Sequence, residues 1–112
     1  MKKTMVAMAL VLASPAYADG ELNIYNWGNY TSPEMITKFE AETGIKVTIT
    51  DYDSNDTALA KIKAGGHGFD IVVPSGTYVP IFVGEGLLME SKPNEMENFK
   101  HMDPQWVDVD FD

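Results

Sequence analysis

The sequence predicts an α/β fold in which a parallel sheet is built from consecutive βαβαβ units. Short apolar or alternating runs suited to strands (residues 22–27, 45–50 and 69–73) are separated by two segments in which apolar residues recur at helical spacing. Each helical segment begins at a capping residue and ends at glycine. Strands that alternate with helices in this way favour right-handed crossovers and a parallel sheet.

The first 18 residues have the composition of a secretory signal peptide. Two lysines precede an apolar run (residues 5–13), and Ala16 and Ala18 put small residues at the −3 and −1 positions of a cleavage site. The run is shorter than the ~18 apolar residues that a membrane span needs, and no later segment approaches that length. We therefore expect residues 1–18 to be cleaved off and residues 19–112 to be exported and not embedded in a membrane.

The first βα unit spans residues 22–44. After the strand, Ser32 and Pro33 predict a helix start, with serine at the N-cap and proline at the first helical position. Gly44 suits the left-handed position that ends such a helix. The apolar face of the predicted helix consists of Met35, Ile36 and Phe39.

The second unit repeats this pattern. Ile45, Val47 and Ile49 alternate with polar residues, which predicts a strand with one packed face. Ser54 or Asn55 can cap the helix that follows, and Gly65-Gly66 ends it. The apolar face of this second helix consists of Ala58, Leu59 and Ile62.

The third strand, Phe69–Val73, is almost wholly apolar, which is typical of a buried central strand in a parallel sheet. A short helix is expected from about Tyr78 to Glu85. Beyond residue 91 the chain becomes polar and acidic, and Asp103-Pro104 predicts another turn or helix start. Because no closing helix or strand follows, we expect residues 19–112 to be an incomplete lobe of a larger protein.

Composition narrows the function classes. Without residues 1–18 the chain has six lysines and 17 acidic residues, a net charge of −11. This charge disfavours nucleic acid and favours cationic solutes, although many exported proteins are acidic merely for solubility. The absence of cysteine excludes a disulfide framework and a thiolate metal site.

In open parallel sheets, ligands bind outside the carboxyl ends of the strands. In the loop after the first strand, Trp27 and Tyr30 can offer ring faces to an ammonium group. Asn26 and Asn29 add amide acceptors, and Gly28 allows a close backbone approach. These residues predict an amine-binding pocket. The same sequence pattern is also expected if the two rings are simply half-buried aromatics at the end of a strand.

A second loop at the same edge carries Ser75, Thr77 and Tyr78, whose hydroxyls could reach the same cleft. Ser75 or Thr77 could equally cap the helix that follows. A helix N-terminus in a cleft disfavours a cation, so the charged ends of an amine would lie elsewhere.

The sequence offers no convincing catalytic or metal site. The serine of "VVPSG" lacks the glycine two residues before it that a nucleophile elbow requires. His67 and His101 have no ligand-spaced partners, and "AGGHG" is not a dinucleotide fingerprint. The acidic residues between Glu85 and Asp112 lack calcium-loop spacing. We therefore predict a protein that is not an enzyme and has neither cofactor nor metal.

Three stretches carry a family resemblance: "YNWGNYTSPEMITKFEAETGIKV", "YDSNDTALAKIKAGGHGFDIVVPSGTYV" and "EGLL". In this order they resemble the amino-terminal lobe of the periplasmic spermidine/putrescine-binding proteins, the solute receptors of polyamine ABC importers. The resemblance covers residues 22–112. It implies one α/β lobe of a two-lobed periplasmic binding protein (type II-like) whose second lobe is missing here, and a monomer that delivers its ligand to an inner-membrane permease.

The same resemblance implies roles for individual residues. Trp27 and Tyr30 would belong to an aromatic box around the polyamine, Gly28 and Asn29 would contact it between them, and Ser75 would lie on the facing loop. The acids that neutralise the ammonium groups would come largely from the second lobe.

The chain departs from the family pattern at three positions. Asn29 stands where relatives often carry an acid, Gly28 where they often carry a small hydroxyl residue, and Thr77 where spermidine binders can place a tyrosine. Two alternatives therefore stay open. One is a receptor for another cationic or amino-acid-derived solute, and the other is a periplasmic sensor or small exported enzyme on the same scaffold.

Overall fold

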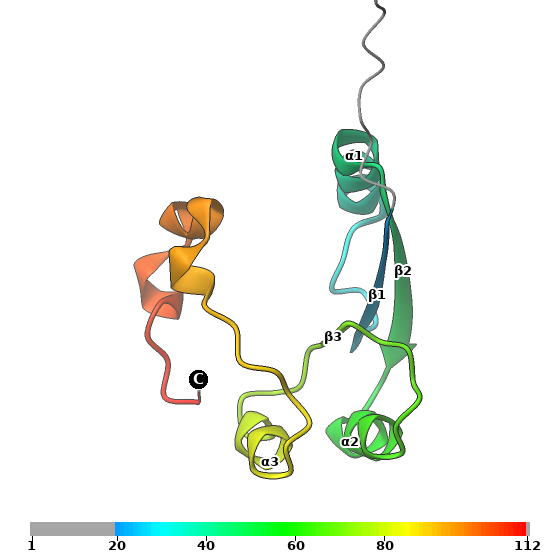
Figure 1. Cartoon of the computed structure of the whole chain (residues 1–112), viewed down its shortest axis with the longest axis vertical. Helices are drawn as coiled ribbons and strands as arrows, with labels where there is room; N and C mark the ends of the chain where they lie inside the picture. Colours follow the sequence, from blue (N-terminus) through cyan, green and yellow to red (C-terminus); the bar gives the residue numbers. More distant parts are fainter. Residues whose placement is uncertain (1–19, 112) are drawn as a thin grey trace, which may run out of the picture.

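A computed structural model describes residues 20–111, so the expected signal peptide lies outside the described residues. Three parallel strands form one sheet in the order β2-β1-β3: β1 (Gly20–Trp27), β2 (Ile45–Tyr52) and β3 (Ile71–Val72). Helices connect them in the predicted alternation (Figure 1). The α/β prediction with a parallel sheet is confirmed.

The register brings the carboxyl ends of the strands together. β1 pairs with β2 along its whole length, from Gly20 opposite Ile45 to Trp27 opposite Tyr52. On its other side β1 pairs with β3, where Tyr25 lies opposite Val72. All three strands therefore end at the same edge of the sheet, and the loops that follow them are neighbours.

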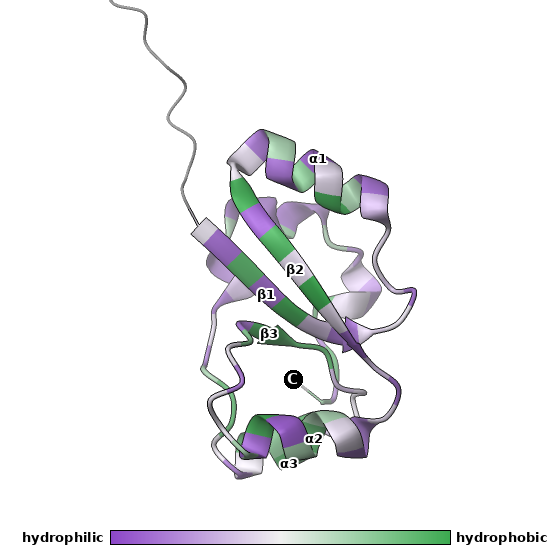
Figure 2. Ribbon diagram, turned by 90° about the vertical axis from the view of Figure 1, so that its right-hand side faces the viewer, coloured by the Kyte–Doolittle hydropathy of each residue, from purple (hydrophilic) through white to green (hydrophobic). Residues whose placement is uncertain are grey.

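The alternation predicted for β2 is present. Residues 45, 47 and 49 are half-buried while residues 46, 48 and 50 are exposed, and the apolar positions stand out as separate bands along this strand (Figure 2). Tyr52 continues the strand beyond the predicted range and is buried. Along residues 45–50 one face of β2 is therefore packed, as its period of two requires, whereas Tyr52 is buried on the opposite face at the end of the strand.

The third strand differs from its prediction as a buried central strand. β3 has only two residues and lies at an edge of the described sheet, while β1 is central. Ile71 is 44% exposed and lines a groove of about 800 Å³ with Val83 and Leu88. An apolar run specifies that its side chains lie against apolar groups. It does not specify which strands pair with it, so the apolar run alone could not distinguish an edge strand of the sheet from a central strand.

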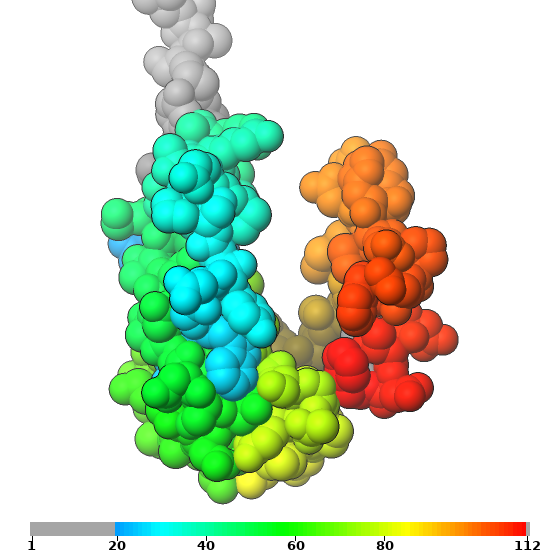
Figure 3. Space-filling view, turned by 180° about the vertical axis from the view of Figure 1, so that it is seen from behind, coloured from blue at the N-terminus to red at the C-terminus, as the bar shows by residue number. Residues whose placement is uncertain are grey.

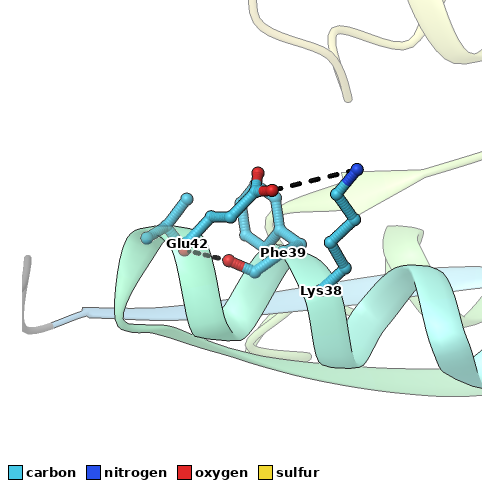
Figure 4. A network of polar contacts seen from close by, with 4 residues as sticks. Lys38, Phe39 and Glu42 are labelled. Carbon is cyan, nitrogen blue, oxygen red and sulfur yellow. Dashed lines mark hydrogen bonds and ion pairs between the residues drawn. The ribbon is translucent and has the colours of Figure 1, made fainter.

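Helix α1 (Pro33–Thr43) has the predicted ends. The Met35 amide donates to the Ser32 hydroxyl over 3.1 Å, and Gly44 adopts φ 72° while its amide donates to Glu40. Lys38 and Glu42 form an exposed ion pair at 3.9 Å, and a hydrogen bond to the Phe39 carbonyl lies beside it (Figure 4). A pair this exposed contributes only about 0.3–0.5 kcal/mol.

The predicted apolar face of α1 is less buried than expected. Met35 is 56% exposed and Phe39 37%, and the helix has no buried residue. The reason is that α1 packs along β2, a strand at the edge of the described sheet, so only part of its circumference meets other elements.

Helix α2 (Asn55–Lys63) is capped by Ser54, whose hydroxyl accepts from the Thr57 amide over 3.1 Å, and not by Asn55. Ala58 and Ile62 are buried as predicted. The short helix α3 (Val79–Gly84) follows the third strand. Tyr78 occupies its N-cap position and makes no capping hydrogen bond through its side chain, so the interpretation of Ser75 or Thr77 as the cap is wrong.

The core is small and lies where β1 and β2 meet α2 and α3. Tyr25 stacks on Phe69 with ring centroids 4.4 Å apart and meets the Tyr52 ring edge-on at 4.6 Å. Phe82 from α3 is fully buried. The buried apolar residues are Tyr25, Tyr52, Ala58, Ile62 and Phe82.

Within residues 87–111 the only helical elements are 3₁₀ turns: η1 (Pro93–Glu95), η2 (Glu97–His101) and η3 (Pro104–Trp106). The turn predicted at Asp103-Pro104 is present, with the Asp103 carboxylate accepting from the Gln105 amide. Across much of its length this segment is separated from the rest of the lobe by an open space (Figure 3).

One contact returns the chain end to the lobe. The ring of Phe111 lies so close to Gly76 that a Cβ at this position would be 2.7 Å from the ring. Gly76 therefore accommodates Phe111, because any side chain there would displace the ring.

Among the described residues, none of the helices has the length and apolar character needed to cross a membrane.

Phe82 provides a test of this core. Phe82→Ala should lower the free energy of unfolding by about 3–5 kcal/mol, since it empties a fully buried aromatic site. Urea denaturation followed by circular dichroism measures the change. The control is Val83→Ala, because Val83 is 61% exposed on the same helix and its truncation should change stability little. Equal effects of the two substitutions would contradict the described core.

Candidate functional site

Three strand ends converge on one backbone carbonyl. The Trp27 indole Nε1–H at the end of β1 donates to the Val73 oxygen over 2.8 Å. The hydroxyl of Tyr52, at the end of β2, donates to the same oxygen. Val73 directly follows β3. This carbonyl therefore fixes both rings at the carboxyl edge of the sheet.

The rings form the wall of an open cavity. The Trp27 and Tyr52 centroids are 4.7 Å apart with planes inclined at 58°, and Tyr30 lies 6.4 Å from Trp27. Trp27 is half-buried and Tyr30 is 70% exposed. The cavity has a volume of about 620 Å³. Its lining residues are Trp27, Gly28, Tyr30, Asp51, Tyr52, Asp53 and Thr57.

Trp27 thus combines the two interpretations that the sequence left open. Its indole nitrogen is tied to the protein, as for a structural aromatic at a strand end, while part of the side chain lines the cavity. An aromatic ring held by its own N–H keeps its π face available and has little freedom left to lose when a ligand binds.

The two asparagines of this loop differ in their surroundings. Asn26 is buried, its Oδ1 accepts from the Trp27 amide over 2.8 Å, and its Nδ2 donates to the Thr31 hydroxyl. Asn29 is exposed and adopts φ 64°, a left-handed conformation that asparagine tolerates better than most residues. Asn26 therefore organises the turn, and neither asparagine lines the cavity.

The second predicted loop does not enter this cavity. Ser75 is paired with Asn55 through two hydrogen bonds, from the Ser75 amide to Oδ1 at 2.9 Å and from Nδ2 to the Ser75 hydroxyl at 3.0 Å. The Tyr78 hydroxyl donates to Asp56 over 2.7 Å. Thr77 is exposed. These bonds tie the loop to the start of α2, and a ligand role for Ser75, Thr77 and Tyr78 stays a prediction.

Four lining residues were missed by the sequence reasoning. Asp51, Tyr52 and Asp53 come from the end of β2, and Thr57 from the first turn of α2. The signal for them was present, because a parallel strand at residues 45–50 must end at the same edge as the other two. The predicted site comprises only the loops after the first and third strands.

Burial and hydrogen bonding, respectively, raise the pKa values of two tyrosines, Tyr52 and Tyr78. Burial raises the pKa of Tyr52 to about 12, with the charge of a neighbouring Tyr25 phenolate adding to the effect. The hydrogen bond to the Asp56 carboxylate raises the pKa of Tyr78. Both hydroxyls therefore stay protonated at neutral pH and continue to donate to their acceptors.

Neither histidine lines the cavity at the carboxyl edge of the sheet. His67 accepts from the Phe69 amide through Nδ1 at 2.9 Å, a local turn contact, and stacks on the Phe69 ring. His101 lies in η2. Over residues 20–111 no group of three histidine, cysteine or acidic side chains is arranged to hold a metal ion.

The raised pKa of Tyr52 gives a test. Because the folded-state pKa lies above the ordinary value of 10.0, the associated stability is complete below pH 10 and is lost as the pH rises toward 12. Tyrosinate absorbance at 295 nm should report one group that titrates near pH 12, and Tyr52→Phe should remove it. If all tyrosines of the folded chain titrated near pH 10, this result would contradict the burial of the Tyr52 hydroxyl.

The chain was compared with known proteins. No family model matches it. It is 37% identical to the spermidine/putrescine-binding periplasmic protein of Salmonella typhimurium over 108 residues, which cover 95% of this chain and 31% of that protein. The protein of the same name from Escherichia coli is 39% identical over 112 residues, 96% of this chain and 32% of the relative.

A solved structure agrees with these relatives. The spermidine/putrescine ABC transporter substrate-binding protein of Streptococcus pneumoniae superimposes with a TM-score of 0.76 at 38% sequence identity, covering 83% of this chain and 29% of that one. The chain thus spans about a third of the length of the proteins it matches. The predicted resemblance is confirmed: over almost its whole length this chain is similar to about a third of the length of the periplasmic spermidine/putrescine-binding proteins.

Proposed function

We propose that this protein is a periplasmic solute receptor that binds a polyamine such as spermidine or putrescine and delivers it to an inner-membrane ABC permease. The observation that carries the proposal is the cavity at the carboxyl edge of the sheet, where the side chains of Trp27 and Tyr30 lie beside two carboxylates. The names of the relatives from Salmonella and Escherichia coli support the same ligand class.

The chemistry of the cavity suits a flexible cation with apolar methylenes. An ammonium group over an aromatic face gains about 0.5–2 kcal/mol, more as water is excluded. The methylenes between two ammonium groups can lie along the faces of Trp27 and Tyr30, while the acidic rim meets the charged ends. A neutral ligand of the same length would gain the apolar contact but not the charge pairing.

Residues 19–112 would act as the amino-terminal lobe, which is exported behind a signal peptide at residues 1–18. The cavity is open toward solvent, and Tyr30 exposes 70% of its surface. A second lobe would cover the ligand and supply further carboxylates. Closure of two lobes around a ligand is a hinge motion, and the ligand favours the closed state because it contacts both lobes only there. The permease would recognise that closed form of a monomeric receptor.

The remaining predicted contacts fit this picture as contacts of the closed form. Gly28 and Asn29 lie on the turn between the two rings and can approach a ligand through their backbone. Ser75, Thr77 and Tyr78 follow the third strand at the same edge and would meet a ligand that extends beyond the cavity.

A receptor for a different cationic or amino-acid-derived solute is the second candidate. It is favoured by Asn29 and Thr77, which stand at positions where relatives often carry an acid and a tyrosine. An enzyme or sensor is less well supported, because the relatives bear the names of binding proteins and neither histidine lines the cavity.

Fluorescence of Trp27 tests the proposal. In a Trp106→Phe background Trp27 is the single tryptophan, so its emission reports on the cavity alone. Spermidine and putrescine should change this emission saturably at millimolar concentration, since one open lobe offers only part of the binding surface. Glutamate and neutral amino acids should not change it.

The matched control is Trp27→Phe with Trp106 retained. Trp106 lies in η3, 60% exposed and outside the cavity, so its emission should not respond to either polyamine. A response to neutral amino acids equal to that to polyamines would favour the second candidate. Saturation at micromolar concentration would contradict a site shared between two lobes.

A further inference from the structure

We propose that Asp51 is the residue of this lobe that pairs with a ligand ammonium group, and that it supplies the charge which position 29 lacks. This inference rests on the proposed function. Asn29 on the adjoining turn is uncharged, exposed and outside the cavity. Asp51 lines the cavity from the neighbouring strand.

The sheet register places Asp51 beside the aromatic wall. On β2 it lies opposite Asn26, one residue before the pair formed by Trp27 and Tyr52. Tyr52 is buried while Asp51 is exposed, as expected for consecutive residues of a strand. The carboxylate therefore stands at the rim of the cavity, while the next side chain along the strand forms its aromatic wall.

The carboxylate of Asp51 extends toward the turn that follows Trp27. Its Oδ2 lies 3.9 Å from the point where a Cβ on Gly28 would stand. Because position 28 is glycine, no side chain comes between this oxygen and the turn. The small residue at position 28 and the acid at position 51 thus form one local arrangement that leaves an anionic oxygen open at the turn that follows Trp27 in the chain.

The Asp51 carboxylate has no partner among the described residues. Other acids of the lobe are engaged: Asp56 by Tyr78, Asp70 by Asn23 and Glu40 by the Val47 amide. Within residues 20–111 the Asp51 side chain takes part in none of the side-chain hydrogen bonds and in none of the three ion pairs. Its oxygens are therefore available to a ligand, and an ammonium group is the partner that satisfies both charge and hydrogen bonding.

Asp53 also lines the cavity and is unpaired within the same residues, so it can strengthen the field at the rim. Asp51 is preferred as the pairing residue because its oxygen lies next to the turn at Gly28, and because a ligand in the cavity that both residues line can meet this carboxylate and the Trp27 ring. A cation held by a π face and an anion at once is bound more selectively than by either alone.

Nuclear magnetic resonance of the whole chain tests this inference. In the Trp106→Phe background, the Trp27 indole Nε1–H signal is titrated with putrescine and with neutral 1,4-butanediol. We expect putrescine to shift the signal saturably and Asp51→Asn to weaken its binding roughly fivefold, the effect of losing one exposed ion pair. Weak binding of butanediol should be unchanged by the substitution.

Two controls make the comparison specific. Glu21→Gln removes the same charge at the opposite end of the sheet, at the start of β1, and should leave putrescine binding unchanged. Asp51→Glu should restore binding, since it keeps the carboxylate. If Asp51→Asn fails to fold, the carboxyl carbon signal of Asp51 in the unsubstituted chain replaces it, and this signal should move with putrescine but not with butanediol.

The outcomes separate this inference from the proposed function. Equal putrescine binding by the Asp51→Asn and starting chains, or equal losses in Asp51→Asn and Glu21→Gln, would overturn the role of Asp51 while leaving a polyamine site in place. No response of the Trp27 signal to putrescine in the starting chain would overturn both.

Discussion

The carbonyl of Val73 is the constraint on which the site depends. It accepts from the indole of Trp27 and from the hydroxyl of Tyr52, and so it joins the ends of β1 and β2 to the residue that follows β3. A buried tyrosine hydroxyl without an acceptor would be costly, so this sharing stabilises the edge of the sheet and aligns the rings together. The arrangement exists before any ligand arrives, which limits the order that binding must impose.

The binding properties of the site follow from the aromatic surface that these hydrogen bonds leave exposed to the cavity. With their polar atoms turned toward the protein, Trp27 and Tyr52 contribute aromatic surface to the cavity, and Tyr30 adds a third ring from the adjoining turn. The end of β2 adds carboxylates to this surface. An aromatic wall with an acidic rim discriminates by charge as well as by shape, which suits a receptor that must select amines from a mixture of small solutes.

The sequence was most informative where local chemistry decides the structure. Capping by Ser32, the left-handed Gly44 and the alternation of β2 were all predictable, because each depends on residues close in the chain. The place of β3 at an edge and the exposure of Met35 were not, because they depend on which elements pack together. The site was predicted in part: Trp27 and Tyr30 meet in the cavity, whereas Asp51 joins them only through the pairing of β1 with β2.

The central claim is that the aromatic faces at the end of β1 contact the ligand directly. Nuclear Overhauser effects between putrescine methylene protons and the ring protons of Trp27 and Tyr30 test it most directly. Contacts to both rings, with the indole N–H of Trp27 still hydrogen-bonded to Val73, are the predicted result. Contacts confined to residues outside the cavity would contradict this account.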